Sequence, residues 1–141
     1  MGFILPEFLP YLLNQAAEAA SREFQRGYRE RYGMLRTEWR VLFHLGCYGD
    51  MNAKRICELA SLHKTKVSRA VHALGAKRFI TRETDPNDRR NEQLSLSPLG
   101  RQVFDDLSGA AEAYEQKLAG LLSDEELTHL RSALLKLKHL S

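Results

Sequence analysis

The feature that most restricts the fold is a pair of short amphipathic segments, residues 53–60 and 64–77, separated by three residues. Apolar side chains recur in both at the spacing of an α-helix. We expect the following residues to face inward: Ile56, Leu59 and Ala60 in the first segment, and Val67, Val71 and Leu74 in the second. The residues of the second segment that then face outward are Lys64, Lys66, Arg69, Ala70 and Lys77. Because the linker Ser61-Leu62-His63 allows only a tight turn, the pattern predicts a helix-turn-helix.

The hydrophobic pattern changes period directly after the second segment. Residues 79–84 and 92–97 alternate in part between apolar and polar side chains, as β-strands do. The polar string between them, Asp85-Pro86-Asn87-Asp88-Arg89-Arg90-Asn91, predicts a hairpin with a charged tip. A helix-turn-helix followed by a basic hairpin predicts a winged helix-turn-helix in a mainly α (α+β) chain.

Longer helical segments flank this motif on both sides. Apolar spacing predicts helices over about residues 10–32 and 98–121, the first ended by Gly33 and the second begun by Ser97 and Pro98. A further helix over about residues 37–47 has Thr37 as its expected N-cap. The string Ser123-Asp124-Glu125-Glu126 is a capping box that opens a last helix.

The leucines of the last helix exceed what a small monomer can bury. This surplus predicts an oligomer, with an interface that includes Leu12, Leu127, Leu130, Leu134 and Leu137. We therefore expect residues 1–36 and 98–141 to form a helical dimerisation region, built from the N- and C-terminal helices. Residues 37–97 would form the winged helix-turn-helix of the same intertwined domain.

The formal net charge of +3 is divided unevenly along the 141 residues. Residues 54–92 hold ten basic and five acidic side chains, a balance of +5, and the remainder holds 11 basic and 13 acidic ones, a balance of −2. Positive charge on the predicted reading elements favours a polyanionic partner.

The composition excludes several other classes of protein. Two cysteines cannot build a disulfide framework, and no run of about 20 apolar residues is present to span a membrane. The apolar start is interrupted by Pro6, Glu7 and Pro10 and lacks a basic leader, so it does not resemble a signal peptide. We expect a cytoplasmic protein without a membrane partner.

Several strings resemble the MarR family of winged-helix transcriptional regulators, over almost the whole chain. The most specific is Arg82, then Asp85-Pro86-Asn87-Asp88-Arg89-Arg90, then Leu94-Ser95-Leu96-Ser97-Pro98-Leu99-Gly100. Shorter matches are Glu58-Leu59-Ala60, Lys66-Val67-Ser68-Arg69 and Trp39-Arg40-Val41-Leu42. Two positions depart from the family: Arg78 stands where Gly is common, and Leu35-Arg36-Thr37 lengthens the entry to the second helix.

The resemblance implies a homodimer that binds double-stranded DNA at a pseudo-palindromic operator, usually as a repressor. It also implies release from DNA by a signal, often a small aromatic or lipophilic effector. A pocket for such an effector would lie where the first, second and fifth helices meet the DNA-binding lobe. The side chains that would line it are Tyr28, Trp39, Phe43 and Tyr114, although plain core packing is the alternative interpretation of each.

The residues expected to contact DNA fall into two groups. The recognition helix offers His63, Lys64, Thr65, Lys66, Ser68 and Arg69, where arginine can fork onto guanine and the other side chains suit bases or phosphates. The wing offers Arg89 and Arg90 for a narrow minor groove, with Asp88 in an orienting role.

Two other functional classes compete with this prediction. An enzyme is disfavoured because the chain lacks a nucleophile elbow, a phosphate loop and a zinc-protease motif, so we expect no catalytic residues and no cofactor. A winged-helix protein-interaction module without specific DNA binding would present an apolar or acidic face on residues 64–77, which are cationic instead.

Neither thiol chemistry nor metal binding is indicated by the sequence. Cys47 and Cys57 are better explained as structural thiols than as redox sensors. His44 and Cys47 lie three apart, and His129 and His139 ten apart, without a compact third ligand. We therefore expect no metal site.

Overall fold

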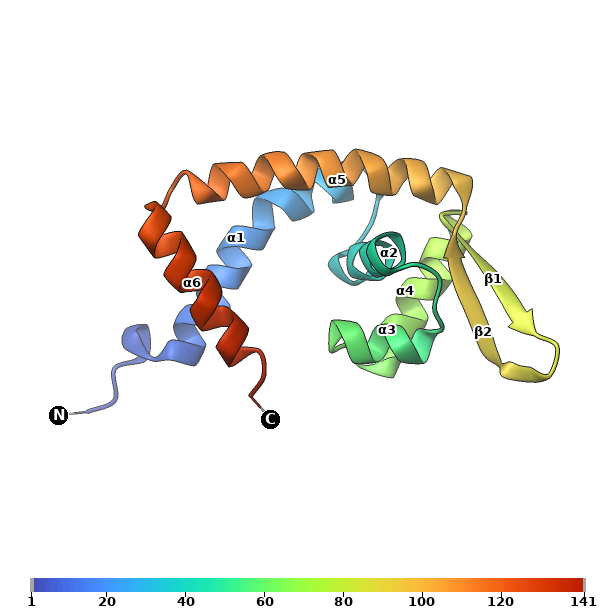
Figure 1. Ribbon diagram of the computed structural model, residues 1–141, viewed down its shortest axis with the longest axis horizontal. Coiled ribbons are helices and arrows are strands. Elements are labelled where there is room, and N and C mark those ends of the chain that lie inside the picture. Colours follow the sequence, from blue (N-terminus) through green and yellow to red (C-terminus); the bar gives the residue numbers. More distant parts are fainter. Residues whose placement is uncertain (1, 141) are drawn as a thin grey trace. The chain divides into compact units, whose positions relative to one another are not determined.

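The computed structural model describes residues 2–140, without the side chain of Arg89. Contacts between residues divide the chain into a first unit that ends at Ser108 and a second unit that begins at Gly109. Figure 1 shows the elements in chain order. They are η1 (Leu5–Glu7), α1 (Leu9–Tyr32), α2 (Arg36–Tyr48), α3 (Ala53–Ala60), α4 (Lys64–Ala76), β1 (Ile80–Asp85), β2 (Asp88–Leu96), α5 (Pro98–Ala119) and α6 (Asp124–Leu137).

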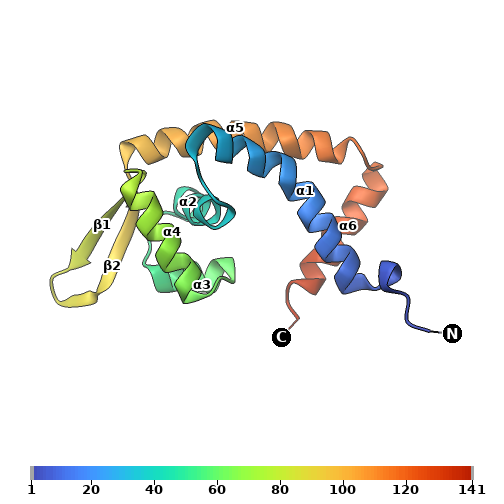
Figure 2. The same cartoon turned by 180° about the vertical axis from the view of Figure 1, so that it is seen from behind.

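The core of the first unit is built by α2, α3, α4 and the root of the hairpin. Leu42, Ile56, Val67 and Leu74 are each fully buried, and Leu94 of β2 is 1% exposed. Burying an aliphatic side chain of this size contributes about 1.5–3 kcal/mol, so this cluster fixes the helices against the hairpin. Figure 2 shows the same group from behind, with α4 between α3 and the strands.

Local signals in the sequence explain most of the helix ends. Gly33 ends α1 in the left-handed region at φ 65°, and Asn52 caps α3 by accepting a hydrogen bond from the Arg55 amide. Ser97 caps α5, because its hydroxyl accepts from the Gly100 amide at 2.9 Å and donates to the Arg78 carbonyl at 2.6 Å. The predicted capping box of α6, Ser123 with Glu126, is confirmed.

Three predictions about the helices were wrong. The N-cap of α2 is Leu35, which makes no side-chain cap, so Thr37 lies inside the helix. Leu59 is 40% exposed, because the two turns of α3 bury only the stripe that contains Ile56 and Ala60. Ala70 is 3% exposed rather than outward, because it lies between Val67 and Leu74 on the buried side of α4.

The hairpin is longer than its alternating pattern predicted. The strands continue through the polar string to a connection of two residues, Pro86 and Asn87. The antiparallel register runs from Ile80 opposite Leu96 to Thr84 opposite Glu92, and then passes directly to Asp85 opposite Asp88. Residues 89–91 therefore bulge out of the ladder, and this bulge holds the two wing arginines.

The second unit consists of the end of α5 and all of α6. An ion pair joins Arg131 to Glu115 at 3.0 Å between these two helices. Apart from the half-buried Leu127, every described residue of α6 is exposed within the single chain. Among the residues described, no helix is long and apolar enough to cross a membrane.

Candidate nucleic-acid interface

The N-terminal half of α4 presents one polar, cationic face. Its exposed residues are Lys64, Thr65, Lys66, Ser68 and Arg69, while Val67, Ala70 and Val71 face the core. Helical periodicity thus separates the packing residues from the predicted DNA-contact residues. The whole outward side remains available to a ligand.

His63 closes the N-terminal end of this helix. Its Nδ1 accepts a hydrogen bond from the Thr65 amide at 3.2 Å, so the side chain is the N-cap of α4. An accepting Nδ1 carries no proton, and the neutral ring therefore bears its N–H on Nε2. The ring is exposed, so His63 is both the cap of α4 and a polar group at the edge of the cationic face.

The recognition helix is held at its other end by a half-buried ion pair. Lys77 Nζ donates to Glu38 Oε1 of α2 at 3.1 Å, and the Glu38 carboxylate is almost fully buried. Since Lys77 is also the C-cap of α4, this pair fixes the far end of the recognition helix against α2.

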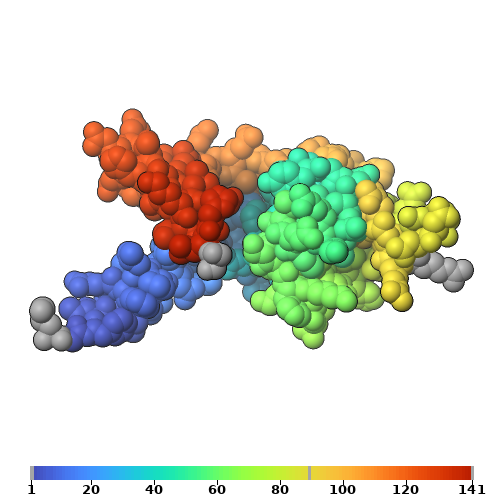
Figure 3. Space-filling view, turned by 60° about the horizontal axis from the view of Figure 1, so that its bottom comes forward, coloured from blue at the N-terminus to red at the C-terminus, as the bar shows by residue number. Residues whose placement is uncertain are grey.

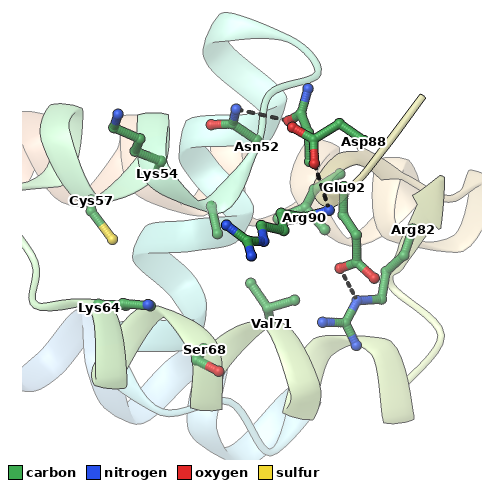
Figure 4. Close-up of a pocket in the computed structure, with 13 residues that line it drawn as sticks. Asn52, Lys54, Cys57, Lys64, Ser68, Val71, Arg82, Asp88, Arg90 and Glu92 are labelled. Carbon is green, nitrogen blue, oxygen red and sulfur yellow. Dashed lines mark hydrogen bonds and ion pairs between the residues drawn. The ribbon is translucent and has the colours of Figure 1, made fainter. Parts of the chain in front are cut away.

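A groove of about 670 Å³ runs between α3, α4 and the wing. Figure 4 shows the Arg90 side chain directed into this groove, opposite Lys54 of α3 and Lys64 of α4. Val71 and Leu94 contribute an apolar floor. In the space-filling view of Figure 3, α3 and α4 (green) form one surface beside the hairpin (yellow).

Three carboxylates stabilise the wing: two accept hydrogen bonds from backbone amides, and one pairs with an arginine. Asp85 accepts from the Asn87 amide at 2.9 Å, and Asp88 accepts from the Arg90 amide at 3.0 Å. Arg82 donates to Glu92 at 3.1 Å across the two strands. The Arg89 side chain lies outside what the structure describes. The contact given for Asp88 orients the backbone of the bulge that carries the wing arginines.

Three of the four residues proposed for an effector pocket form an aromatic cluster in the first unit. The Tyr28 and Trp39 rings stack at 5.7 Å, and Trp39 and Phe43 lie 4.9 Å apart. Burial raises the pKa of Tyr28, partly offset by the nearby Arg36 cation. Within the described part of the chain, the buried Trp39 Nε1 has no hydrogen-bond partner. Tyr114 belongs to the second unit, where it is half-buried.

The predicted interface leucines are largely uncovered in the single chain. Leu12 of α1 is 45% exposed, and Leu130, Leu134 and Leu137 of α6 are each between 38% and 44% exposed. The start of the chain adds further exposed apolar side chains, among them Phe3, Ile4 and Leu9. Each unit therefore carries its own apolar surface.

The thiols and histidines form no site among the described residues. Cys47 is exposed, and Cys57 is half-buried on the α3 side of the groove. In residues 2–140, no group of three His, Cys, Asp or Glu side chains gathers as metal ligands would.

Comparison with known proteins finds similarity to one family of regulators. The model of the MarR family matches residues 32–91, which contain α2, α3, α4 and most of the hairpin. The structure of the MarR-family transcriptional regulator SPO1453 from Silicibacter pomeroyi superposes with a TM-score of 0.83, at 27% identity over 96% of both chains. The chain is similar to the MarR family over this segment, and to SPO1453 over nearly its whole length.

Two curated regulators and a further solved structure are also similar to this chain. The helix-turn-helix-type transcriptional regulators YwaE and YxaD of Bacillus subtilis are 27% and 34% identical, over 67% and 63% of this chain. This chain spans 56% and 64% of their respective lengths. BpsR of Bordetella bronchiseptica has the same fold, with a TM-score of 0.88 at 21% identity over all of both chains. The DNA binding of BpsR is regulated by 6-hydroxynicotinic acid.

Sequence reasoning assigned no site role to several residues that line the groove. Lys54 entered only in the charge balance and Arg82 only in the charge balance and the family resemblance. Asn52 was not singled out, although an Asn directly before a helix is a strong N-cap signal. The groove itself has no local signal, because it forms between segments about 40 residues apart.

Proposed function

We propose that this protein is a sequence-specific DNA-binding transcriptional regulator, and that it acts as a homodimeric repressor. The observation that carries the proposal is the exposed cationic face of α4 beside a wing whose bulge contains Arg89 and Arg90. In the proposed complex, α4 enters the major groove of a half-site, where the Arg69 guanidinium makes a bidentate contact with a base. The wing reaches the adjacent minor groove.

Two kinds of contact to DNA supply affinity and sequence discrimination. Lysines and the His63 Nε2–H group hold phosphates and give an affinity that falls steeply with salt. Arg69 and the wing arginines supply discrimination between sequences. Two copies related by two-fold symmetry read two half-sites about one helical turn apart.

Selection of bound sequences from random DNA tests this function. The proposal expects an enriched inverted repeat with half-site centres about 10 base pairs apart. Replacement of Arg89 and Arg90 by alanine together is expected to abolish the gel shift of that sequence while the far-ultraviolet circular dichroism stays unchanged. A pool that remains random after repeated selection contradicts specific binding.

The exposed apolar residues of α1 and α6 support the homodimer. We propose residues 1–36 and 98–141 as its dimerisation region, with Leu12, Leu127, Leu130, Leu134 and Leu137 in the interface. Light scattering is expected to give a mass near twice 16.1 kDa. A stable mass of one chain at micromolar concentration contradicts this part of the proposal.

The aromatic cluster supports a response to a small aromatic or lipophilic effector. The unpaired indole N–H of Trp39 offers a buried donor among ring faces, which suits an aromatic ligand that carries an acceptor oxygen. Trp39 is the single tryptophan of the chain, so its fluorescence reports ligand binding directly. The proposal expects phenols or aromatic acids to change this fluorescence and to release DNA over the same concentration range; release without a change at Trp39 would place the effector elsewhere.

A further inference from the structure

The wing is attached to the start of α3 at two levels. At the root, Met51 and Leu94 exchange backbone hydrogen bonds of 3.2 and 2.9 Å, and both side chains are buried. Further out, Asn52 Nδ2 donates to Asn91 Oδ1 at 3.0 Å. Since a strand rises about 3.3 Å per residue, this second contact lies about 10 Å along β2 from the first.

Asn52 makes both of its side-chain contacts at once. Its Oδ1 accepts from the Arg55 amide at 2.8 Å and caps α3, while its Nδ2 reaches the wing. The amide group is therefore oriented by the helix before it meets Asn91. This arrangement transmits the orientation of the helix-turn-helix to the hairpin through one short side chain.

Asn91 is the last residue of the bulge in β2. The register leaves residues 89–91 without partners in the ladder, so β1 does not fix their orientation. Among the described side chains, the Asp88 carboxylate accepts from the Arg90 amide and the Asn52 amide donates to Asn91, so both contacts hold the bulge. Figure 4 shows the Asn52 contact at the rim of the groove into which Arg90 points.

A two-stranded hairpin has little stability of its own, and a small rotation at its root moves its tip by several ångströms. We infer that the Asn52–Asn91 hydrogen bond is a positioning contact that fixes the wing and its arginine bulge relative to α4. This inference rests on the proposed function, because it concerns how the recognition helix and the wing meet DNA together. Neither asparagine needs to touch DNA for this role.

Two substitutions break the contact and spare the rest of the site. Asn91→Ala removes the acceptor and leaves the cap of α3 intact. Asn52→Ser keeps a good N-cap oxygen but is too short to reach Asn91. Gln93→Ala, on an exposed position of the same strand, is the matched control, and the Asn52→Ser/Asn91→Ala double variant closes a double-mutant cycle.

Binding to the selected operator and to a scrambled duplex is measured by fluorescence anisotropy. Because each single variant removes one neutral hydrogen bond between α3 and the wing, it is expected to bind the operator about 3- to 10-fold more weakly. The double variant should be no weaker than either single one, and Gln93→Ala should match the wild type. Binding to the scrambled duplex should change less than about 2-fold, since phosphate contacts dominate it.

Footprinting distinguishes a positioning role from a general loss of structure. The variants should keep the protection of guanine N7 in the major groove and lose the protection of minor-groove sugars at the wing. Operator affinity and footprints equal to the wild type would overturn the inference, as would equal loss of both protections. A wild-type protein without sequence preference would overturn the proposed function as well, whereas specific wild-type binding with unaffected variants would overturn this inference alone.

Discussion

The junction between the wing and α5 leaves no room for a side chain at Gly100. A Cβ atom built on this residue would lie 1.8 Å from the Phe79 carbonyl oxygen and 2.8 Å from the Phe79 carbonyl carbon. The same oxygen accepts the hydrogen bond of the Ser97 amide at 3.0 Å, which joins the end of the hairpin to the start of α5. Gly100→Ala is therefore a direct test of this packing.

The expected cost follows from the displacement that alanine requires. An ordinary carbon–oxygen contact is about 3.3 Å, so helix and carbonyl must separate by about 1.5 Å. Overpacking of a rigid site costs about 1–3 kcal/mol, and loss of the Ser97–Phe79 hydrogen bond adds about 1 kcal/mol. We expect Gly100→Ala to lower the free energy of unfolding by about 2–4 kcal/mol. With an unfolding entropy of about 0.3 kcal/mol/K for a chain of this length, Tm falls by about 7–14 °C.

Differential scanning calorimetry at a fixed protein concentration measures this shift. Gly75→Ala is the matched control, because it lies in α4 with no atom within 4 Å of the added Cβ. Alanine is the better helix former there, so this control should raise the stability by about 0.5–1 kcal/mol. A Tm of Gly100→Ala equal to or above that of the wild type would refute the packing described here.

Three further predictions concern the backbone and the ion pairs. Arg78 adopts φ 64°, so Arg78→Gly should raise the free energy of unfolding by about 0.5–1 kcal/mol in urea titrations, whereas Arg78→Ala should bring no gain. Lys77→Met leaves the buried Glu38 carboxylate unpaired and should lower the free energy of unfolding by about 2 kcal/mol in the same titration. The Glu38→Met/Lys77→Met double variant should recover most of this loss. Additive losses in the double variant would contradict the pairing. Hydrogen bonds from Tyr32 and Arg31 lower the pKa of Asp106 below the ordinary value of 3.8. The ionised Asp106 carboxylate therefore stabilises the fold above about pH 4, and this stabilisation is lost as the pH falls through the lowered pKa. On acidification, the Tm of Asp106→Asn should fall less than the Tm of the wild type. Parallel curves of Tm against pH would refute the role of Asp106.

Predictions from the sequence succeeded where the signal was local. The bounds of α3 match the expectation, α4 ends one residue earlier than expected, and the caps at Gly33, Ser97 and Ser123 were all recognised from the residues themselves. A capping side chain acts within three residues of its own position, so the sequence contains the whole interaction.

Predictions failed where the deciding partner lies far along the chain. Ala70 was expected to face outward but lies on the buried side of α4, a helix that packs against α2. The burial of Glu38 was not predicted, because its ion-pair partner Lys77 lies 39 residues away. The hairpin continues through polar residues because backbone pairing, rather than burial of side chains, maintains its outer part. Arg78, which stands where glycine is common in the family that the sequence resembles, has a positive φ, and this conformation was not predicted from the sequence.

Arg69→Ala tests most directly whether the exposed face of α4 contacts base edges. Affinities for the selected operator and for a scrambled duplex are measured at the same salt concentration, because phosphate contacts depend on salt. The variant is expected to lose about 1–3 kcal/mol of binding free energy on the operator and much less on the scrambled duplex. Equal losses on both duplexes would show that Arg69 contacts only phosphate and would contradict its contact with base edges.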